Sequence, residues 1–413
     1  MDINTVLVAK RRIYTLKGAL ATLSLITLLP LSLQIAATET EDVLTFYTLP
    51  TSLPAGIPGE IFREEPMRAG PPSANKAADA FRVMYHSANA LGNPNLTTGS
   101  IIIPKGSTST LRNIVVMAPG TAGPAFRCTP SRMIDNGAYY EQSAINDMLS
   151  RGYIIAIPDY EGYHQNPQST YIVGRSMGAA AIDIARATAH HFNANVSEYQ
   201  VAFRGYSQGG AASLWAAQMQ PTYAPEMTVV GTAAGGVPAN LAQVALPLEG
   251  QPGFGVLFYA LLGQDYAYPE LSLSPYLSDA GRAAVSSMEN DMCVIELIQG
   301  FSGKKLSDLT DINPLNLDRF NRIAENELGK TEITSPIFQY HEIQDGLVAF
   351  GQAKDLRTTY CSQGATHTWK EYDTDGENGV IRHINLVYHG NADVIDFLEN
   401  RFSGIPASSN CVE

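Results

Sequence analysis

The stretch that decides the fold is residues 201–217, VAFRGYSQGGAASLWAA. Its opening run, Val201-Ala202-Phe203, is typical of a buried strand, and the residues from Gly209 onward are typical of a helix. Between them lies Gly205-Tyr206-Ser207-Gln208-Gly209, a G-x-S-x-G pattern. A strand, a tight turn and a helix in this order expose a serine hydroxyl at the top of a sheet. We therefore predict a strand–turn–helix unit that presents Ser207.

The residue types of this turn fit nucleophilic chemistry. A serine hydroxyl is a weak nucleophile, so it needs a tight presentation beside a base. Glycines two residues either side of Ser207 avoid side-chain clashes in such a turn. The backbone amide of Gln208 can then point at a developing oxyanion. The alternative is a glycine-rich turn that contains an incidental serine.

Other apolar runs place this unit in a larger sheet. Continuous apolar runs separated by helical segments indicate parallel strands that are buried on both faces, so their alternation predicts a doubly wound α/β sheet. The expected parallel strands are 114–117, 153–157, 201–203, 229–230, 336–340 and 367–370, and the expected helices are 139–149, 177–192, 209–219 and 392–402. A hairpin of 81–85 and 100–104, with Asn93-Pro94 in its turn, is expected ahead of them.

The alternation breaks over residues 239–332, which contain helix-like segments and few strand-like runs. We predict that they form an insertion between two strands of one sheet. The core is then split into residues 79–238 and 333–413. Residues 38–78 are rich in Pro, Gly, Ala and Glu without clear periodicity, and we expect an extended N-terminal arm there.

Residues 1–37 have the features of a secretory signal peptide. A basic start is followed by an uncharged stretch from Gly18 to Thr38 that ends in the small residues Ala36-Ala37. An uncleaved membrane anchor is the alternative, because the apolar run is just long enough to span a bilayer. Pro30 and the small residues favour cleavage, so we expect a secreted, extracellular or periplasmic protein.

Composition excludes several classes of protein. The 413 residues are 45% hydrophobic and 16% charged, which is ordinary for a globular chain and excludes a disordered or collagen-like one. The net charge of −13 makes nucleic acid a poor partner. An even number of cysteines in an exported chain suggests two disulfides, with three pairings open. The spacing of the cysteines gives no zinc motif, and we expect no metal or cofactor. These cysteines are Cys128, Cys293, Cys361 and Cys411.

A serine nucleophile on such a sheet needs an acid and then a histidine, in that chain order. Asp345 follows the predicted strand 336–340 by five residues and is the favoured acid, with Glu342 as its rival. Three histidines lie downstream. From position alone we favour His383, which we expect in a mobile loop before the last helix, over His389 and His367.

A second oxyanion donor is expected from the loop after an early central strand. Strand 114–117 is followed by Ala118-Pro119-Gly120-Thr121-Ala122-Gly123, whose glycines let the backbone approach a substrate closely. The Thr121 amide is the favoured donor, and its hydroxyl is a further candidate. The alternative is an ordinary glycine-rich turn.

Taken in order, these motifs resemble those of the secretory lipase family, which includes fungal lipase A and related bacterial α/β-hydrolases. The resemblance is collinear from about Phe46 to Phe402. The resembling motifs are Gly56-Ile57-Pro58-Gly59, Tyr85-His86-Ser87, Pro119-Gly120-Thr121 with Cys128-Thr129-Pro130-Ser131, Asp159-Tyr160-Glu161-Gly162, Gly205–Gly210, Asp345-Gly346-Leu347-Val348, Tyr360-Cys361-Ser362-Gln363-Gly364-Ala365 and His383-x6-Gly390. Pro119 departs from the histidine that bacterial members often carry before the Gly-Thr.

The resemblance implies an α/β-hydrolase fold with a mostly parallel central sheet and an inserted helical cap over an acyl-binding tunnel. It implies disulfides Cys128–Cys293 and Cys361–Cys411. It also implies a lipase or esterase with the triad Ser207, Asp345 and His383, an oxyanion hole from Gln208 and Thr121, and transient contact with a lipid interface.

Other activities stay open from the sequence alone. They are a short-chain or non-lipid esterase, an acyltransferase, and an inactive binding protein of the same fold. The apolar cap segment 254–262, FGVLFYALL, either packs within the cap or lines an acyl site.

Overall fold

The computed structural model describes residues 44–106, 113–165 and 167–411, so the predicted signal peptide lies outside the described residues. The chain divides into two compact units, with the boundary between Phe46 and Tyr47. Residues 44–46, the described part of the first unit, are helical. The sheet and all of its helices belong to the second unit.

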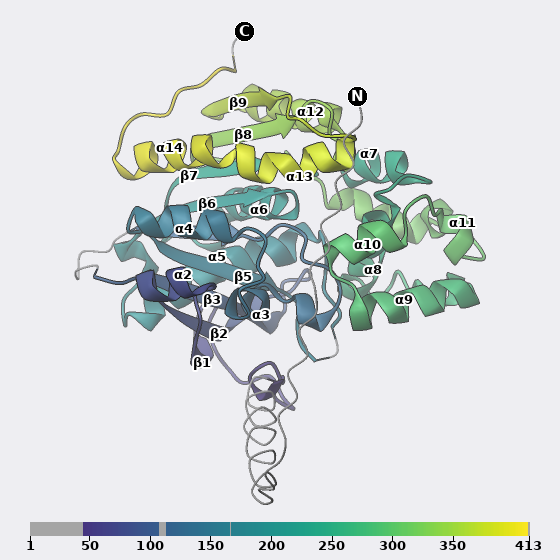
Figure 1. Ribbon diagram of the computed structural model, residues 1–413, viewed down its shortest axis with the longest axis horizontal. Helices are drawn as coiled ribbons and strands as arrows, with labels where there is room; N and C mark the ends of the chain where they lie inside the picture. The colour runs from purple at the N-terminus through teal and green to yellow at the C-terminus, as the bar shows by residue number, and fades with distance from the viewer. Residues whose placement is uncertain (1–43, 107–112, 166, 412–413) are drawn as a thin grey trace, which may run out of the picture. The chain divides into compact units, whose positions relative to one another are not determined.

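One sheet organises the second unit. Its strands lie in the order β1-β2-β3-β5-β4-β6-β7-β8-β9 across the described residues (Figure 1). The pairs β1–β2, β2–β3 and β3–β5 are antiparallel, and every pair from β5 to β9 is parallel. The strands are β1 (Ile61–Met67), β2 (Ala78–Ala88), β3 (Pro94–Pro104), β4 (Asn113–Ala118), β5 (Ile154–Tyr160), β6 (Gln200–Tyr206), β7 (Thr228–Gly235), β8 (Ile337–Glu342) and β9 (His367–Tyr372).

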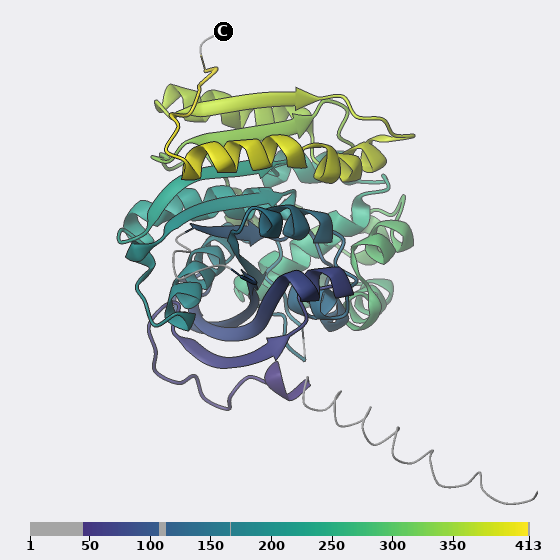
Figure 2. The ribbon, with the colours of Figure 1, turned by 60° about the vertical axis from the view of Figure 1, so that its left-hand side comes forward.

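Helices cover both faces of the sheet, as expected for parallel strands. In β4, Val116 packs into one core layer and Val115 into the other. The first layer contains residues of α5 (Gly174–His191), α6 (Gln208–Tyr223) and α12 (Phe350–Ser362). The second contains residues of α4 (Gln142–Ser150), α13 (Gly379–His389) and α14 (Asn391–Phe402). Figure 2 shows the yellow helices α13 and α14 running along the sheet, where they contact β8 and β7.

The predicted hairpin is confirmed, with Phe81 of β2 opposite Ile101 of β3. Residues 38–78, for which we expected an extended N-terminal arm, include strand β1 and the short helix α2 (Pro72–Ala77), which the sequence analysis did not predict. Strand β1 reads IFREEPM, so its charges and Pro66 hide the strand pattern. An edge strand tolerates such residues because only one side is paired, here with β2.

Residues 239–332 lie between β7 and β8 and contain no strand of the sheet within the described part of the chain. We call these residues the cap. Figure 1 shows its green helices gathered beside the sheet. The helices are α7 (Leu241–Ala245), α8 (Phe254–Ala267), α9 (Asp279–Asp291), α10 (Val294–Gly300) and α11 (Leu306–Leu309).

Two disulfides form, in the pairing that the resemblance implies. Cys128, at the end of a 3-10 turn before α3 (Pro130–Asp135), is bonded to Cys293 at the start of α10. Cys361 at the end of α12 is bonded to Cys411 in the C-terminal segment. None of the helices in the described ranges is long and apolar enough for a transmembrane span.

Candidate active site

Ser207 occupies the junction between β6 and α6 in a strained conformation, with φ 57° and ψ −120°. A non-glycine residue adopts such angles only where its surroundings enforce them. A Cβ atom on Gly205 would lie 2.2 Å from the carbonyl oxygen of Gly209, and one on Gly209 would lie 2.0 Å from that of Ala118. The turn therefore accepts only glycine at these two positions, which is the reason for the sequence pattern.

The amide of Gln208 opens helix α6 directly after Ser207. The first N–H groups of a helix have no partner within the helix, and the helix dipole makes this end partly positive. The Gln208 side chain is buried and its Nε2 lies 3.5 Å from the sulfur of Met177. The position of the Gln208 backbone amide in the first turn of α6 therefore suits it to bind an anion beside Ser207.

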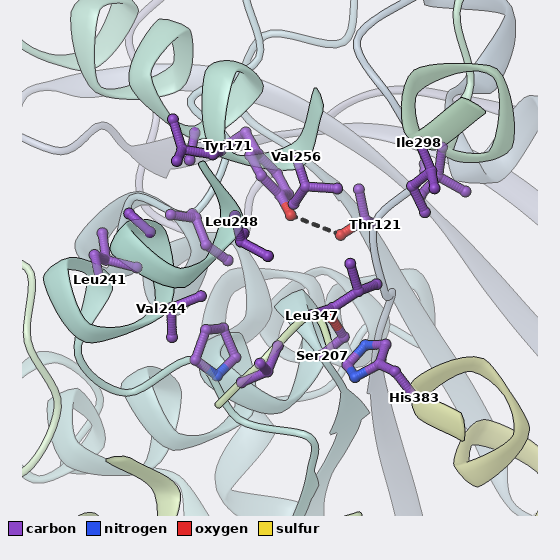
Figure 3. Close-up of a pocket in the computed structure, with 18 of the residues that line it drawn as sticks. Thr121, Tyr171, Ser207, Leu241, Val244, Leu248, Val256, Ile298, Leu347 and His383 are labelled. Carbon is purple, nitrogen blue, oxygen red and sulfur yellow. Dashed lines mark hydrogen bonds between the residues drawn. The ribbon is translucent and has the colours of Figure 1, made fainter. Parts of the chain in front are cut away.

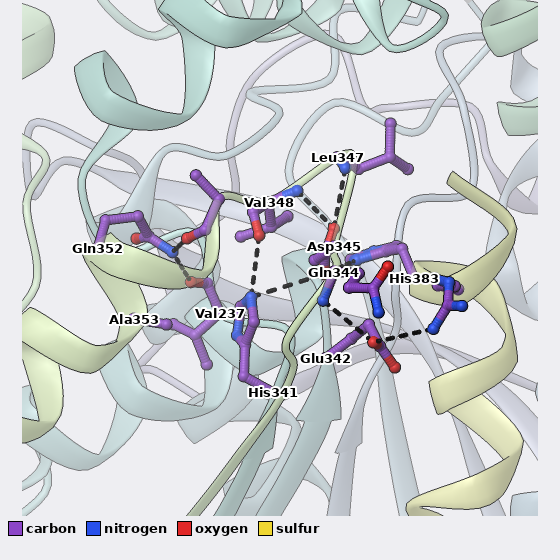
Figure 4. A network of polar contacts seen from close by, with 12 residues as sticks. Val237, His341, Glu342, Gln344, Asp345, Leu347, Val348, Gln352, Ala353 and His383 are labelled. Atoms are coloured by element: carbon purple, nitrogen blue, oxygen red, sulfur yellow. Dashed lines mark hydrogen bonds and ion pairs between the residues drawn. The ribbon is translucent and has the colours of Figure 1, made fainter. Parts of the chain in front are cut away.

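The structure brings Asp345 and His383 together, with 2.6 Å between Asp345 Oδ2 and His383 Nδ1 (Figure 4). The other carboxylate oxygen of Asp345 accepts hydrogen bonds from the amides of Leu347 (2.8 Å) and Val348 (2.7 Å). Burial alone would raise the pKa of Asp345, but His383, His341 and the Val348 amide outweigh burial and lower it. Asp345 is therefore an anion that orients the imidazole of His383.

Glu342, the rival acid, is engaged elsewhere. It is fully buried, and its Oε2 accepts hydrogen bonds from the amide (2.8 Å) and the hydroxyl (2.7 Å) of Thr374. Its Oε1 accepts from the amide of Gln344 and lies 3.8 Å from Arg382 (Figure 4). These contacts hold the segment after β9 against β8.

His383 lies within helix α13, so the expectation of a mobile loop around it was wrong. Asn378 caps this helix by accepting hydrogen bonds from the amides of Val380 and Ile381. The carbonyl of His383 also accepts a hydrogen bond from the Tyr206 hydroxyl at 2.8 Å. His383 thus lies on a capped helix that is hydrogen-bonded to Tyr206, the residue before Ser207.

The two alternative histidines are placed differently. His367 lies in β9, where its Nε2 is 2.9 Å from Gln339 Oε1, and burial lowers its pKa to about 4. His389 is exposed at the end of α13. His383 lines the pocket described next, and these two do not.

A pocket of about 680 Å³ opens beside Ser207, His383 and Thr121 (Figure 3). Its walls are mostly aliphatic side chains of the cap. They include Leu241, Val244 and Ala245 of α7, Val256, Leu257, Ala260 and Leu261 of α8, and Val294, Ile295 and Ile298 of α10. The predicted cap segment 254–262 therefore contributes directly to the wall. Such a cavity suits a long apolar ligand with its polar end at Ser207.

Ser207 and His383 line the same pocket, but no hydrogen bond links their side chains within the described residues. In unliganded hydrolases this contact often tightens only when substrate binds. The strained serine, the His383–Asp345 pair and the amide of Gln208 nonetheless form the parts of a nucleophilic site.

Comparison of the sequence with protein families identifies the family of this chain. The secretory lipase profile matches residues 131–410, which is more than half of the chain. The chain belongs to the secretory lipase family. The matched range includes Ser207, Asp345 and His383 but not Thr121.

Comparisons with individual proteins agree with this membership. Lipase 6 of Candida albicans is 27% identical, over 89% of this chain and 82% of its own length. Secreted triacylglycerol lipase LIP1 of Malassezia furfur is 26% identical, over 89% and 77%. The crystal structure of Candida antarctica lipase A in its closed state has a TM-score of 0.78 at 22% identity, covering 89% of this chain and 87% of that one. This secretory lipase thus has the α/β-hydrolase fold.

The loop that contains Thr121 is held by a tyrosine that sequence reasoning missed. Thr121 is buried, and its Oγ1 lies 2.8 Å from the hydroxyl of Tyr171 (Figure 3). The ring of Tyr171 stacks on Tyr259 of α8, with 4.1 Å between centroids. This stack joins the loop to the cap. A lone tyrosine in a loop carries no signal of such a role.

His341 is a second residue that sequence reasoning missed. It is fully buried in β8, with Nε2 2.9 Å from the Val348 carbonyl and 3.6 Å from Asp345 Oδ2 (Figure 4). Burial lowers its pKa, which favours a neutral ring that donates from Nε2 to the Val348 carbonyl.

In the described ranges, no cluster of three His, Cys, Asp or Glu side chains is suited to bind a metal ion.

Proposed function

We propose that this chain is a secreted serine hydrolase that cleaves carboxylic esters of fatty acids, including acylglycerols, through an acyl-enzyme on Ser207. The observation that carries the proposal is the strained Ser207, which shares one large apolar pocket with the Asp345-bound His383. Membership of the secretory lipase family supports the same activity. The Malassezia furfur relative is named a secreted triacylglycerol lipase, which supports acylglycerols as substrates and an extracellular location.

In the first half of the reaction, Ser207 Oγ attacks the ester carbonyl carbon and its proton passes to His383 Nε2. The carbonyl oxygen becomes an oxyanion that the amides of Gln208 and Thr121 stabilise. Asp345 keeps the proton on Nδ1 and stabilises the imidazolium. The tetrahedral intermediate then collapses, the ester C–O bond breaks, and the alcohol leaves with the proton from His383.

In the second half, His383 takes a proton from water and the hydroxide attacks the acyl-enzyme. The same amides stabilise the second oxyanion. Ser207 leaves with the proton from His383, and the fatty acid is released. The reaction needs water alone as co-substrate.

The pocket lining favours fatty acyl groups over small ones. Burying an acyl chain contributes about 0.8 kcal/mol per CH₂ group. The aliphatic walls supplied by α7, α8 and α10 can provide this contribution. A short-chain esterase would gain little from such a lining.

A panel of p-nitrophenyl esters from acetate to palmitate, together with emulsified triacylglycerol, tests the proposal. We expect kcat/KM to rise with chain length and triacylglycerol to be cleaved, with both activities lost in Ser207→Ala. Activity on acetate alone would indicate the short-chain esterase instead. An inactive wild-type protein that does not react with a fluorophosphonate would contradict the proposal.

A further inference from the structure

The peptide group between Pro119 and Gly120 is held at both of its polar atoms. Its carbonyl oxygen accepts a hydrogen bond from the Tyr160 hydroxyl at 2.9 Å, and its N–H donates to Glu141 Oε1 at 2.9 Å. Tyr160 is 3% exposed and Glu141 is 1% exposed. These holding groups come from two separate elements, because Tyr160 ends β5 and Glu141 precedes α4.

We propose that Glu141 and Tyr160 are positioning residues that fix the orientation of the Pro119–Gly120 peptide and thereby aim the next amide, that of Thr121, at the oxyanion. The inference rests on the proposed function, in which Thr121 supplies the second oxyanion donor. It concerns residues that touch neither the substrate nor the triad.

The loop needs contacts from other elements because the residues Pro119 and Gly120 do not themselves fix its backbone conformation. The ring of Pro119 fixes its φ near −65° but leaves its ψ free. Gly120 has no room for a side chain, since a Cβ there would lie 2.3 Å from the Tyr140 hydroxyl. A glycine has the freest backbone of all residues. The two hydrogen bonds fix the plane of the Pro119–Gly120 peptide and so restrict ψ of Pro119 and φ of Gly120. This leaves ψ of Gly120 as the one backbone torsion between the held peptide and the Thr121 amide.

Burying the carboxyl group of Glu141 has a free-energy cost. This cost argues that its contact with the Gly120 amide serves a function. Burial raises the pKa of its carboxyl, and the Gly120 amide and the charge of Arg204 oppose that rise. Arg204 is itself buried in β6, three residues before Ser207. The Tyr139 hydroxyl also donates to Glu141 Oε1, at 3.2 Å. Gly120 and Glu141 are both buried, so bulk water does not compete for this hydrogen bond and the loop amide is firmly held.

The expected consequence is kinetic. Removing an oxyanion donor typically lowers turnover roughly 10²–10³-fold. Loss of either hydrogen bond leaves the Thr121 amide present but wrongly oriented. A displacement near 1 Å can lower the rate up to about 10²-fold. We therefore expect kcat to fall roughly 10–100-fold when the hydrogen bond of Glu141 or of Tyr160 to this peptide is removed. KM should change little, because ground-state binding does not use the oxyanion donors.

Three variants and one control test the inference. Glu141→Met removes the acceptor at similar size, Glu141→Gln keeps an acceptor oxygen without the charge, and Tyr160→Phe removes only the hydroxyl. Tyr85→Phe is the matched control. Tyr85 is fully buried, and its hydroxyl donates to the Ala180 carbonyl at 2.9 Å, the same bond type and length as in Tyr160 but in the interface between β2 and α5.

We expect kcat per titrated active site to fall in Glu141→Met and Tyr160→Phe, and to be kept in Glu141→Gln and Tyr85→Phe. Melting temperature does not separate these groups, since every variant loses a buried polar contact or charge. An alkylboronic acid provides a second readout, because its tetrahedral adduct with Ser207 places an oxygen in the oxyanion site. Its affinity should fall in step with kcat, whereas binding of a non-hydrolysable ether analogue should not change.

The outcomes separate this inference from the proposed function. Wild-type kcat and boronic-acid affinity in both Glu141→Met and Tyr160→Phe would overturn the inference while ester hydrolysis stands. Equal losses in Tyr160→Phe and Tyr85→Phe would also overturn it, because they would indicate general loosening. Should Glu141→Met fail to fold, Tyr160→Phe still decides the matter. A wild-type protein without ester hydrolysis or fluorophosphonate labelling of Ser207 would remove the proposed function itself.

Discussion

At the scale of single residues, the glycines beside Ser207 are the most constrained positions of the site. A Cβ on Gly209 would meet the Ala118 carbonyl at 2.0 Å, and a rigid backbone atom cannot yield as a side chain can. We expect Gly209→Ala to lower the free energy of unfolding by roughly 1–3 kcal/mol or more. Urea denaturation measures this, and activity should fall with it.

Gly351 supplies a control for that substitution. It lies in α12 with no neighbouring atom within 4 Å of an added Cβ. Alanine is preferred to glycine in helices by roughly 0.5–1 kcal/mol, so Gly351→Ala should be neutral or stabilising. Equal stability of the two variants would mean that the turn around Ser207 can relax, and that its glycine pattern has another cause.

The proposed acid of the triad can be tested by a matched pair of substitutions. Asp345→Asn removes the charge that orients His383, and in the serine protease precedent such a change lowers turnover roughly 10⁴-fold. Glu342→Gln alters a carboxyl of similar burial that serves Thr374 instead. We expect it to lower stability and to affect turnover far less. The reverse order of turnover in p-nitrophenyl ester assays would make Glu342 the acid.

The sequence predicted site residues where they form a motif of neighbouring positions, and not where their partners are distant in the chain. Ser207 and its glycines are adjacent in the chain, so their pattern alone predicts the turn. Position already favoured His383 over His389, and the His383-x6-Gly390 spacing of the family resemblance strengthened that choice. Glu141 carries no local signal at all. Its partner Gly120 lies 21 residues away, and only the packed structure brings the two together.

At the scale of elements, helix α8 tests whether the cap selects substrates. Val256, Leu257, Ala260 and Leu261 line the pocket, and Ala260 is the smallest of them. Ala260→Phe should narrow the pocket, so that kcat/KM falls for palmitate esters and is kept for acetate. Ala283→Phe, at an exposed position of α9, is the control. An equal loss on both esters in a folded Ala260→Phe protein would argue against an acyl-binding role for α8.

The strands and helices could be predicted from the sequence where the pattern of hydrophobic residues matches the pattern of burial in the structure. Every expected parallel strand lies in the sheet, because strands buried on both faces are continuously apolar. The edge strand β1 escaped notice because its exposed positions are charged. Helix α13 escaped notice because His383 was expected to need a mobile loop. The Asn378 cap and the apolar residues after it were the available signal.

At the scale of the whole molecule, the two disulfides close loops of different length. Cys128–Cys293 spans 165 residues and Cys361–Cys411 spans 50. On the chain-entropy model the longer loop contributes about 1 kcal/mol more to stability. We expect the double variant Cys128→Ser/Cys293→Ser to be less stable than Cys361→Ser/Cys411→Ser by about that amount in urea denaturation. The opposite order would show that native contacts, and not loop length, decide the loss.

The pH dependence of folding follows from acids that are buried as part of the core. Burial raises the pKa of Asp159 to about 6, although Ser131 and Thr98 donate hydrogen bonds to it. A carboxyl with a raised pKa in the folded state binds more protons when folded than when unfolded. Its contribution to stability is therefore complete below its unfolded pKa near 4 and is lost as the pH rises through about 6.

Asp159→Asn isolates that contribution from those of other groups. The wild-type protein should lose roughly 3 kcal/mol of unfolding free energy between about pH 4 and pH 7 through this one carboxyl, whereas the Asn variant cannot. The stability difference between the two proteins should therefore shrink as the pH rises. Urea denaturation at several pH values measures it. Parallel curves for the two proteins would mean that Asp159 folds as an ordinary ionised carboxylate, held by its three hydrogen bonds against the cost of burial.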